Sequence, residues 1–333
     1  MAEKIRWGVI STADIARTAV IPAIRASRNG RVLAVASRDL KRARAYADSL
    51  DIERAYGSYE ELLADPDIDA IYNPLPNDGH APWSIAAARA HKPTLVEKPM
   101  ALNAEQAQQM VDVFRAEGVL LAEAFMYRYH PQHVRVRELL VQGLIGPLNL
   151  IDACFTYSMA PTETANVRLK PELGGGGLMD VGCYCVNLCR MMAGSEPEIV
   201  TGQAVIGAAS KVDESFVGTL RFPGGVLAHF DCGMRTQYRN QYTLSGPEGM
   251  IVAGTAFLPP RQGPATIQVY RGQAAPELIT IPAANQYQLM VEDFADAVQQ
   301  GRKVTYDPLD SVKTMRVLDA LARAARDGKS IPI

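Results

Sequence analysis

A short apolar run that stops on three chemically distinct residues could carry chemistry. Thr94-Leu95-Val96 has the composition of a buried strand, and Glu97-Lys98-Pro99 follows it directly. In an open parallel sheet, ligands collect beyond the carboxyl ends of the strands, so a carboxylate and an ammonium at this point predict a site. A second pair, Asp180 and Tyr184, lies at i and i+4 near the start of a helix predicted over residues 179–192, so both side chains can point at one ligand.

Alternating strand and helix patterns must position the first of these groups. Apolar strands are predicted over residues 5–10, 31–37, 68–72 and 119–122, and helices over 15–27, 40–50, 59–64, 82–90 and 104–117. This alternation predicts a dinucleotide-binding domain with a parallel sheet. Its phosphate loop is atypical, because Ser11, Ala13 and Ala16 occupy the positions of a G-x-G-x-x-G/A fingerprint. An ordinary strand-to-helix turn is the alternative for this loop.

The end of the second predicted strand bears on the choice of cofactor. Where an NAD-binding protein would place an acidic residue for the ribose hydroxyls, this chain has Ser37 and Arg38, followed by Asp39. An arginine and a hydroxyl suit a 2′-phosphate, so we expect NADP rather than NAD. A solvated arginine at a helix start is the alternative.

Composition favours two domains and a small ligand. The chain has 333 residues, with 34 basic and 36 acidic side chains, a net charge of -2 and no run of like charges. We therefore expect no nucleic-acid or membrane partner. No apolar run reaches the roughly 18 residues of a spanning helix, so a cytoplasmic location is expected. Five cysteines are too few for a disulfide framework and match no common zinc spacing, so we expect reduced, buried thiols and no metal.

Several motifs together resemble the Gfo/Idh/MocA oxidoreductases almost from end to end. Glu97-Lys98-Pro99 matches the Glu-Lys-Pro motif of that family, and further matches lie at residues 73–80, 124–131 and 174–184. Within the family, the chain is most similar to the dimeric dihydrodiol dehydrogenases and the NADP-dependent D-xylose dehydrogenases, which share an Asp-x-Gly-x-Tyr-Cys pattern. The phosphate loop departs from the family, because most relatives keep glycines at positions 11 and 13.

We predict an α/β Rossmann domain at residues 1–125 and an α+β domain at 126–333. Beyond a change of texture near residues 143–147, period-two runs such as Glu214 to Phe222 predict a large, mostly antiparallel open sheet. The resemblance implies that one face of this sheet packs on helices and the other pairs with a second subunit, which predicts a homodimer. Two helices are predicted over residues 287–300 and 309–326. Whether they pack on the first domain or on the second is not decided by the sequence. Residues 156–177 are predicted to form a long loop.

For a reaction that removes a hydride from a carbinol, as the resemblance implies, Lys98 and Tyr184 are the expected catalytic pair. An adjacent ammonium could lower the pKa of a phenol by roughly 2 to 3 units, which lets it act as a base near neutrality. Asp180 would orient the substrate or Lys98, and Glu97 would anchor Lys98. The alternatives are a buried tyrosine with a satisfied hydroxyl, and a carboxylate that only favours a helix N-terminus.

The expected function is therefore an NADP(H)-dependent oxidoreductase acting on a sugar or a cyclic diol, with oxidation of an aldose at its anomeric carbon first. A ketosugar reductase and a non-catalytic, NADP-binding regulatory protein are the alternatives. Two roles are open for Arg128: it contacts the cofactor or the substrate, or it only connects neighbouring loops. The predicted cofactor-binding residues are Ser11, Thr12, Ala13, Ile15, Ser37, Arg38, Asn73, Leu75, Asn77, His80, Glu97, Lys98 and Arg128.

Overall fold

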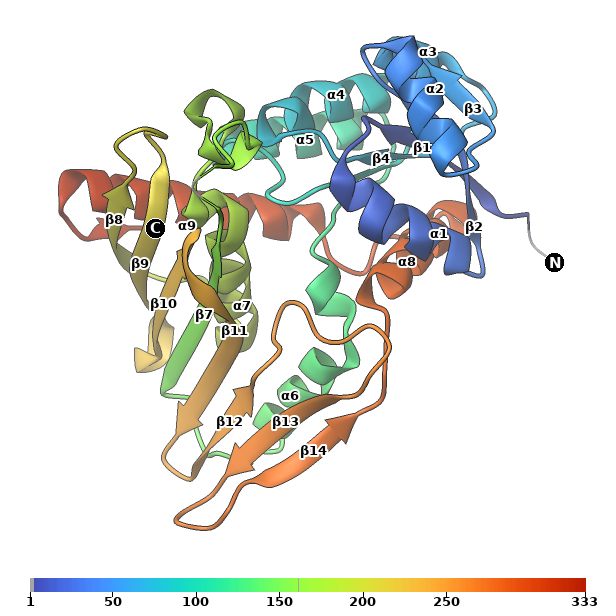
Figure 1. The fold of residues 1–333 in the computed structure, drawn as a ribbon. Coiled ribbons are helices and arrows are strands. Elements are labelled where there is room, and N and C mark those ends of the chain that lie inside the picture. Colours follow the sequence, from blue (N-terminus) through green and yellow to red (C-terminus); the bar gives the residue numbers. More distant parts are fainter. Residues whose placement is uncertain (1–2, 161) are drawn as a thin grey trace. The chain divides into compact units, whose positions relative to one another are not determined.

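A computed structural model describes residues 3–160 and 162–333 of the chain. Met1 and Ala2, in the predicted first domain, and Pro161, in the predicted loop, lie outside the described residues. The chain forms two compact units (Figure 1). The first runs to Met126 and includes Gln286–Val312, and the second comprises Tyr127–Asn285 and Lys313–Ile333. The last long helix, α9 (Pro308–Asp327), therefore contributes residues to both units.

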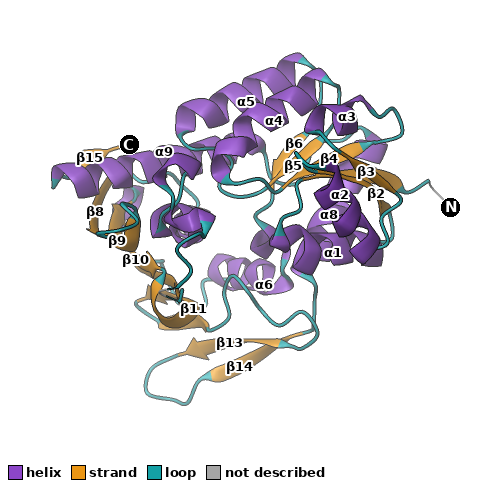
Figure 2. Cartoon of the chain, turned by 45° about the horizontal axis from the view of Figure 1, so that its top comes forward, coloured by secondary structure: helices purple, strands orange, loops and turns teal. Residues whose placement is uncertain are grey.

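The first unit contains a six-stranded parallel sheet with the order β3-β2-β1-β4-β5-β6. Its strands are β1 (Ile5–Ile10), β2 (Gly30–Ala36), β3 (Arg54–Tyr56), β4 (Ala70–Asn73), β5 (Thr94–Val96) and β6 (Leu121–Glu123). Its helices are α1 (Ile21–Ala26), α2 (Leu40–Ser49), α3 (Tyr59–Ala64), α4 (Asn77–Arg89), α5 (Ala104–Ala116) and α8 (Gln286–Gln300) (Figure 2). The strand order reverses between β1 and β4, which is where doubly wound sheets bind their ligands. The predicted Rossmann fold is confirmed.

Helix α8 belongs to the first unit although it lies late in the sequence, and it packs against the elements at the start of the chain. Phe294 of α8 contacts the ring of the fully buried Trp7 on β1, with centroids 5.4 Å apart. The Asn29 amide nitrogen donates to the backbone oxygen of Glu292 at 2.9 Å, and the Arg28 guanidinium pairs with the Asp296 carboxylate. An apolar stripe and a polar rim thus fix this helix against β1 and β2.

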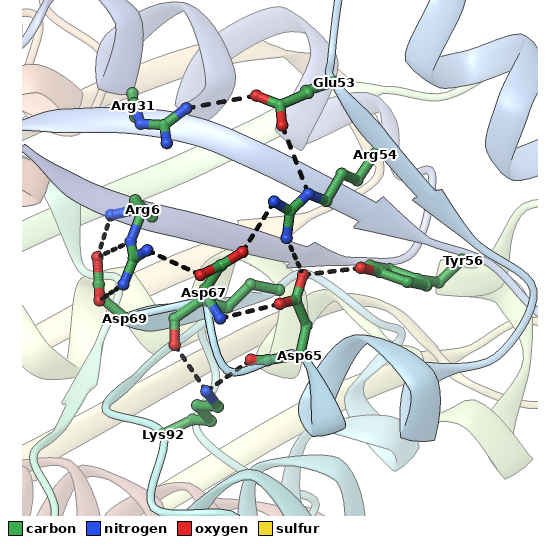
Figure 3. Close-up of polar contacts among 10 residues, drawn as sticks. Arg6, Arg31, Glu53, Arg54, Tyr56, Asp65, Asp67, Asp69 and Lys92 are labelled. Carbon is green, nitrogen blue, oxygen red and sulfur yellow. Dashed lines mark hydrogen bonds and ion pairs between the residues drawn. The ribbon is translucent and has the colours of Figure 1, made fainter.

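A network of charged residues lies at the amino ends of these strands (Figure 3). Arg54, the first residue of β3, donates to Asp65 at 2.9 Å and pairs with Asp67 at 2.8 Å. Arg6 on β1 pairs with Asp69 at 2.8 Å, and Lys92 donates to the backbone oxygens of Asp65 and Ile68. Ligands bind at the opposite, carboxyl ends of the strands in sheets of this kind. We therefore interpret this network as stabilising the sheet and not as a ligand site.

The second unit contains a nine-stranded sheet with the order β14-β13-β12-β11-β7-β10-β9-β8-β15. The strands are β7 (Leu150–Ser158), β8 (Ile199–Ile206), β9 (Asp213–Arg221), β10 (Leu227–Gly233), β11 (Arg235–Gly246), β12 (Gly249–Ala253), β13 (Ala265–Tyr270), β14 (Glu277–Ile281) and β15 (Ile331–Pro332). Among the described strands of this sheet, only β7 and β10 pair in parallel, so the sheet is mostly antiparallel, as predicted. Helices α6 (Pro131–Val141) and α7 (Cys183–Ala193) complete the unit together with part of α9.

The predicted period-two pattern of β9 is confirmed by its burial. Phe216 and Leu220 are buried, whereas Val217, Thr219 and Arg221 point to solvent. A Cβ atom on Gly218 would lie 3.1 Å from a methyl carbon of Leu321 in α9, so the buried face of the strand packs on that helix. The opposite face carries the exposed side chains.

Two predictions made from composition, on the cysteines and on membrane-spanning helices, can be compared with the structure. All five cysteines, Cys154, Cys183, Cys185, Cys189 and Cys232, are buried and free, as expected. Among the described helices, none has the length and apolar character needed to cross a membrane. The cytoplasmic location stays a prediction.

Several predicted boundaries differ from the structure. Helix α4 begins at Asn77, directly after its N-cap residue Pro76, and not at Pro82, because a polar first turn with Asp78 suits a helix N-terminus. Pro82 is accommodated inside the helix, so the predicted start there was wrong. The strand predicted over 119–122 lies at Leu121–Glu123. The helix predicted from residue 179 begins instead with a π-helical turn, Leu178–Gly182, which continues into α7.

The glycine run that precedes this turn is required by close packing. A Cβ atom on Gly175 would lie 2.4 Å from the backbone oxygen of Arg168, and one on Gly176 would lie 2.2 Å from Oδ1 of Asp213. Gly176 also has a φ of +121°, which disfavours any side chain. Oδ2 of Asp213 accepts a 2.6 Å hydrogen bond from the amide of Leu178 and so holds the start of the helix. Burial raises the pKa of Asp213 to about 6, although the amides of Leu178 and Gly177 lower it.

This raised pKa predicts a specific pH dependence of stability. Because the folded state binds the proton of Asp213 more tightly than the unfolded state, its contribution to the free energy of unfolding should fall as pH rises from about 4 to about 6. The difference should be on the order of 2 kcal/mol. Asp213→Asn, which cannot titrate but still accepts from Leu178, should lack this decline. Urea unfolding of both proteins between pH 4 and pH 7 measures it, with Glu198→Gln as a surface control. Parallel pH profiles for the wild type and Asp213→Asn would contradict the assignment.

Candidate functional site

Ser11 begins the loop that follows β1, at the switch point of the sheet. Its φ is +81°, in the left-handed region where a glycine is usual and another residue costs about 1 to 2 kcal/mol. Its amide donates to the backbone oxygen of Ala36 at 2.9 Å, while its buried Oγ atom has no hydrogen-bond partner among the described residues. A strained residue with an unpaired polar atom is typical of a ligand-binding loop. This observation favours a phosphate loop over an ordinary turn.

Helix α2 holds the same loop from the side. The Arg42 guanidinium donates through Nε to Oγ1 of Thr12 at 2.8 Å, and the Tyr46 hydroxyl donates to the backbone oxygen of Ala13 at 3.1 Å. The Arg17 guanidinium lies 4.4 Å from the centre of the Tyr46 ring. Beyond Ile15, residues Ala16–Val20 form a π-helical turn before α1. These contacts from Arg42 and Tyr46 fix the loop, and no motif in the sequence predicts them.

Two arginines lie at the carboxyl end of β2. Ser37 is buried and Arg38 is exposed, while the Asp39 carboxylate caps α2 by accepting from the amides of Lys41 and Arg42. Burial raises the pKa of Tyr59, and the charges of Arg38 and Arg42 lower it, which places both guanidiniums near that phenol. Arg42 was missed by the sequence analysis. Its spacing of four residues from Arg38 is the signal that could have found it.

The loop between β4 and α4 is held together by Asn73. Its amide nitrogen lies 3.2 Å from the backbone oxygen of His80 and 3.1 Å from the Ser84 hydroxyl, and its oxygen accepts from the amide of Leu75 at 3.3 Å. Asn77 is the first residue of α4. The described contacts of Asn73 thus shape the loop, and its predicted cofactor contact stays a prediction.

Lys98 lies in a turn that is held by side chains from β4, β6 and α4. The Tyr72 hydroxyl of β4 donates to Oε1 of Glu97 at 2.6 Å, and Oε2 of Glu97 accepts from the amide of Lys98 at 3.2 Å. Oε1 of Glu123, at the end of β6, accepts from the amide of Met100 at 2.7 Å. The Lys98-Pro99 peptide is cis. Tyr72 was also missed by the sequence analysis, because its position inside an apolar strand gives no functional signal.

His80 of α4 contacts the same turn. One ring nitrogen lies 2.8 Å from the backbone oxygen of Pro99 and the other lies 2.7 Å from that of Leu75. Burial lowers the pKa of His80 to about 4 against the effect of both carbonyls, and the charge of Lys98 lowers it further. A neutral ring can donate to only one of these two carbonyl oxygens, whereas a protonated ring could donate to both.

In the second unit, Tyr184 lies in an aromatic setting at the start of α7. Its side chain is 5% exposed and its ring lies 5.3 Å from Phe155, 5.4 Å from Phe257 and 5.8 Å from Tyr127, measured between centroids. The Tyr127 hydroxyl donates to the Asn187 side-chain oxygen at 2.6 Å. Rings on several sides give the Tyr184 phenol a surrounding of low polarity.

Asp180 precedes Tyr184 by four residues, across the change from the π-helical turn to α7. Its Oδ2 atom accepts from the Tyr157 hydroxyl at 2.7 Å and pairs with Nε of Arg168 at 2.9 Å. Tyr157 lies on β7, and Arg168 lies in a short 3-10 turn (Val167–Leu169) of the predicted loop. Neither partner was predicted as a site residue.

The predicted residues thus fall into two groups. Residues 11–15, 37–38, 73–80 and 97–98 lie at the carboxyl ends of four neighbouring strands of one sheet, as a dinucleotide site requires. Asp180 and Tyr184 lie together in the second unit, and Arg128 lies in a 3-10 turn (Met126–Tyr129). The first group can hold a nucleotide and present an ammonium, and the second can hold a phenol beside a carboxylate.

Comparisons with known proteins agree with this arrangement. Residues 5–125 match the family described as "Oxidoreductase family, NAD-binding Rossmann fold", and residues 133–252 match "GFO/IDH/MocA C-terminal domain".

Individual relatives cover most of the chain. D-xylose 1-dehydrogenase (NADP(+)) 2 of Haloferax volcanii is 36% identical over 98% of this chain and 99% of its own. Trans-1,2-dihydrobenzene-1,2-diol dehydrogenase of Mus musculus is 37% identical over 74% of this chain and 73% of its own. The crystal structure of KijD10, a 3-ketoreductase from Actinomadura kijaniata in complex with NADP and TDP-benzene, has a TM-score of 0.92 and 33% identity, covering 97% of this chain and 98% of that chain. The chain therefore belongs to the GFO/IDH/MocA family of oxidoreductases.

Proposed function

We propose that the protein is an NADP(H)-dependent oxidoreductase that transfers a hydride between the nicotinamide and a CH–OH carbon of a sugar or a cyclic diol. Family membership supports the reaction class, and the xylose dehydrogenase and KijD10 both carry NADP in their names or complexes. The observation that carries the proposal is the fixed turn that presents Lys98 at the carboxyl end of β5. The buried Ser11 hydroxyl and the guanidiniums of Arg38 and Arg42 fit a dinucleotide with a 2′-phosphate.

When bound, the nicotinamide supplies the two-electron acceptor or donor. In the proposal, Tyr184 takes the hydroxyl proton of the substrate, and the Lys98 ammonium stabilises the phenolate and the reacting oxygen. An ammonium next to a phenol shifts its pKa by roughly 2 to 3 units, or about 3 to 4 kcal/mol of differential stabilisation. Asp180 orients the substrate or Lys98. Glu97, held by Tyr72, keeps the turn in place.

The substrate we favour is an aldose oxidised at its anomeric carbon to a lactone, or a trans-dihydrodiol. Names of two relatives support these, a D-xylose 1-dehydrogenase and a dihydrodiol dehydrogenase. A ketosugar reductase is the second candidate, since KijD10 is a 3-ketoreductase. The same residues would serve it in the reverse direction. Assays with pentoses and trans-dihydrodiols plus NADP⁺, and with ketosugars plus NADPH, distinguish the candidates. Cofactor binding without any turnover would favour a regulatory protein instead.

The proposed roles of Lys98 and Tyr184 predict selective losses of rate. Lys98→Ala and Tyr184→Phe should each lower kcat by about 10² to 10⁴-fold, because each removes one part of the proton transfer. The Kd for NADP⁺, measured by fluorescence titration, should change little in Tyr184→Phe. Tyr127→Phe, which removes a neighbouring hydroxyl of the same aromatic cluster, and Lys313→Ala, an exposed lysine, are the matched controls. A kcat within about threefold of wild type in Tyr184→Phe would refute its role as the base.

Arg38 and Arg42 predict the cofactor preference. Each guanidinium that contacts a phosphate contributes about 1.5 to 3 kcal/mol, so Arg38→Ala and Arg42→Ala should each weaken NADP⁺ binding by about 10 to 100-fold. Binding of NAD⁺, which has no 2′-phosphate, should stay nearly unchanged in Arg38→Ala. In Arg42→Ala, which also loses the hydrogen bond to Thr12, it should weaken less than binding of NADP⁺ does. Isothermal titration of both cofactors measures the two constants. Arg44→Ala, another arginine of α2, is the control, and an equal loss for NAD⁺ and NADP⁺ would contradict the 2′-phosphate assignment.

We also propose a homodimer formed through the exposed face of the nine-stranded sheet. Val217 on β9 and Leu227 on β10 are 53% and 50% exposed, and their strand register puts both on the face opposite the helices. Val217→Asp should therefore dissociate the dimer, because it would bury an unpaired carboxylate. Leu278→Asp on the edge strand β14 should leave it intact. Sedimentation velocity measures both, and a monomeric wild type would end the proposal.

A further inference from the structure

The Asp180 carboxylate receives two donors on a single oxygen. Oδ2 accepts from the Tyr157 hydroxyl at 2.7 Å and from Nε of Arg168 at 2.9 Å. A charge-assisted hydrogen bond and a phenolic one together fix the rotation of a carboxylate far better than either alone. Asp180 itself is 13% exposed, so water contributes little to its orientation.

The two donors come from different parts of the second unit. Tyr157 lies on the central strand β7, whereas Arg168 lies in a turn whose start is capped by the side chain of Asn166, with Oδ1 accepting from the amide of Arg168 at 3.0 Å. The backbone oxygen of Arg168 accepts from the amide of Gly176 at 2.9 Å. The close approach of Gly175 to that same oxygen, described above, leaves no room for a side chain. The glycine run therefore fixes Arg168 as well as the start of the helix.

The charge of Asp180 raises the pKa of the groups around it. The charge of Asp180 acts on Arg168, Tyr157 and Cys232. Burial raises the pKa of Tyr157, the charge of Asp180 raises it further and the charge of Arg168 lowers it, so the hydroxyl keeps its proton and donates a hydrogen bond to Asp180. The charge of Asp180 likewise raises the pKa of Arg168. Tyr157 is thus no competing base to Tyr184, and Arg168 is a permanent cation in the same cluster.

We propose that Arg168 is a positioning residue, which together with Tyr157 holds the Asp180 carboxylate in the orientation from which it acts beside Tyr184. The inference rests on the proposed function, because Asp180 has a catalytic role only there. Arg168 acts through Asp180 and not by touching the substrate. Its side chain is 45% exposed, so the loop that carries it lies at the surface while the carboxylate that it holds is covered.

Steady-state kinetics test this role first. Arg168→Gln should lower kcat by about 10 to 100-fold through a misplaced carboxylate, with KM for the sugar within about threefold of wild type. Arg168→Lys should recover part of kcat, and Tyr157→Phe should lower it less than Arg168→Gln does. Arg135→Gln is the matched control, because Arg135 is 38% exposed and pairs with Glu138 at 2.9 Å in the same unit. A rise in KM alone would mean that Arg168 binds the substrate directly, and would overturn the inference.

A double-mutant cycle separates positioning from direct action. In an Asp180→Asn background, Arg168→Gln should cost less than about threefold in kcat, because the group through which it acts is already changed. The full loss in that background would overturn the inference. Thermal unfolding of each variant identifies any that fails to fold, in which case Arg168→Lys and Tyr157→Phe carry the cycle.

A measurement without turnover keeps this inference distinct from the proposed function. With ¹³C-labelled aspartate, the Asp180 carboxyl signal can be assigned by its loss in Asp180→Asn. Arg168→Gln should raise the pKa of Asp180 by about one unit, because it removes the adjacent cation. An unchanged pKa would overturn the positioning role even in an active enzyme. If the wild type turns over no sugar or diol, the proposed function fails, and this titration alone decides whether Arg168 holds Asp180.

Discussion

The placement of Lys98 depends on a buried hydrogen bond, from the Tyr72 hydroxyl to Oε1 of Glu97 at 2.6 Å. A carboxylate at the end of an apolar strand is costly to bury unless donors meet it, and Tyr72 and the amide of Lys98 are those donors. His80 and Glu123 fix the next two residues of the turn. The ammonium is therefore presented by a rigid scaffold of β4, α4 and β6, which is the arrangement that preorganised catalysis requires.

The second unit solves a similar problem with different parts. Asp180 and Tyr184 lie where a π-helical turn passes into an α-helix, and turns of this kind are frequent at functional sites. The buried Asp213 holds the first amide of that turn, and Tyr157 and Arg168 hold the carboxylate. The Asp180 carboxylate proposed for the reaction is thus held by partners from two different elements.

Much of this could be predicted from sequence because it rests on local pattern. The period-two runs gave the second sheet, the strand-helix alternation gave the Rossmann fold, and a strand ending in Glu97-Lys98 gave the first half of the site. What escaped prediction depends on tertiary contacts. Arg42 and Tyr157 look like ordinary helix and strand residues until folding brings them to Thr12 and Asp180. The start of α4 was predicted at Pro82 because proline is common at the first position of a helix, whereas here it lies inside the helix.

The most direct test of the whole account follows the hydrogen that leaves the substrate. An aldose or dihydrodiol deuterated at the carbon to be oxidised is incubated with the protein and NADP⁺, and the reduced cofactor is examined by mass spectrometry and proton NMR. One deuterium should appear at a single face of the nicotinamide C4, and Lys98→Ala should form the reduced cofactor at least about 10²-fold more slowly. Reduced cofactor without deuterium, or no reduction with any sugar or diol while NADP⁺ binds, would contradict it.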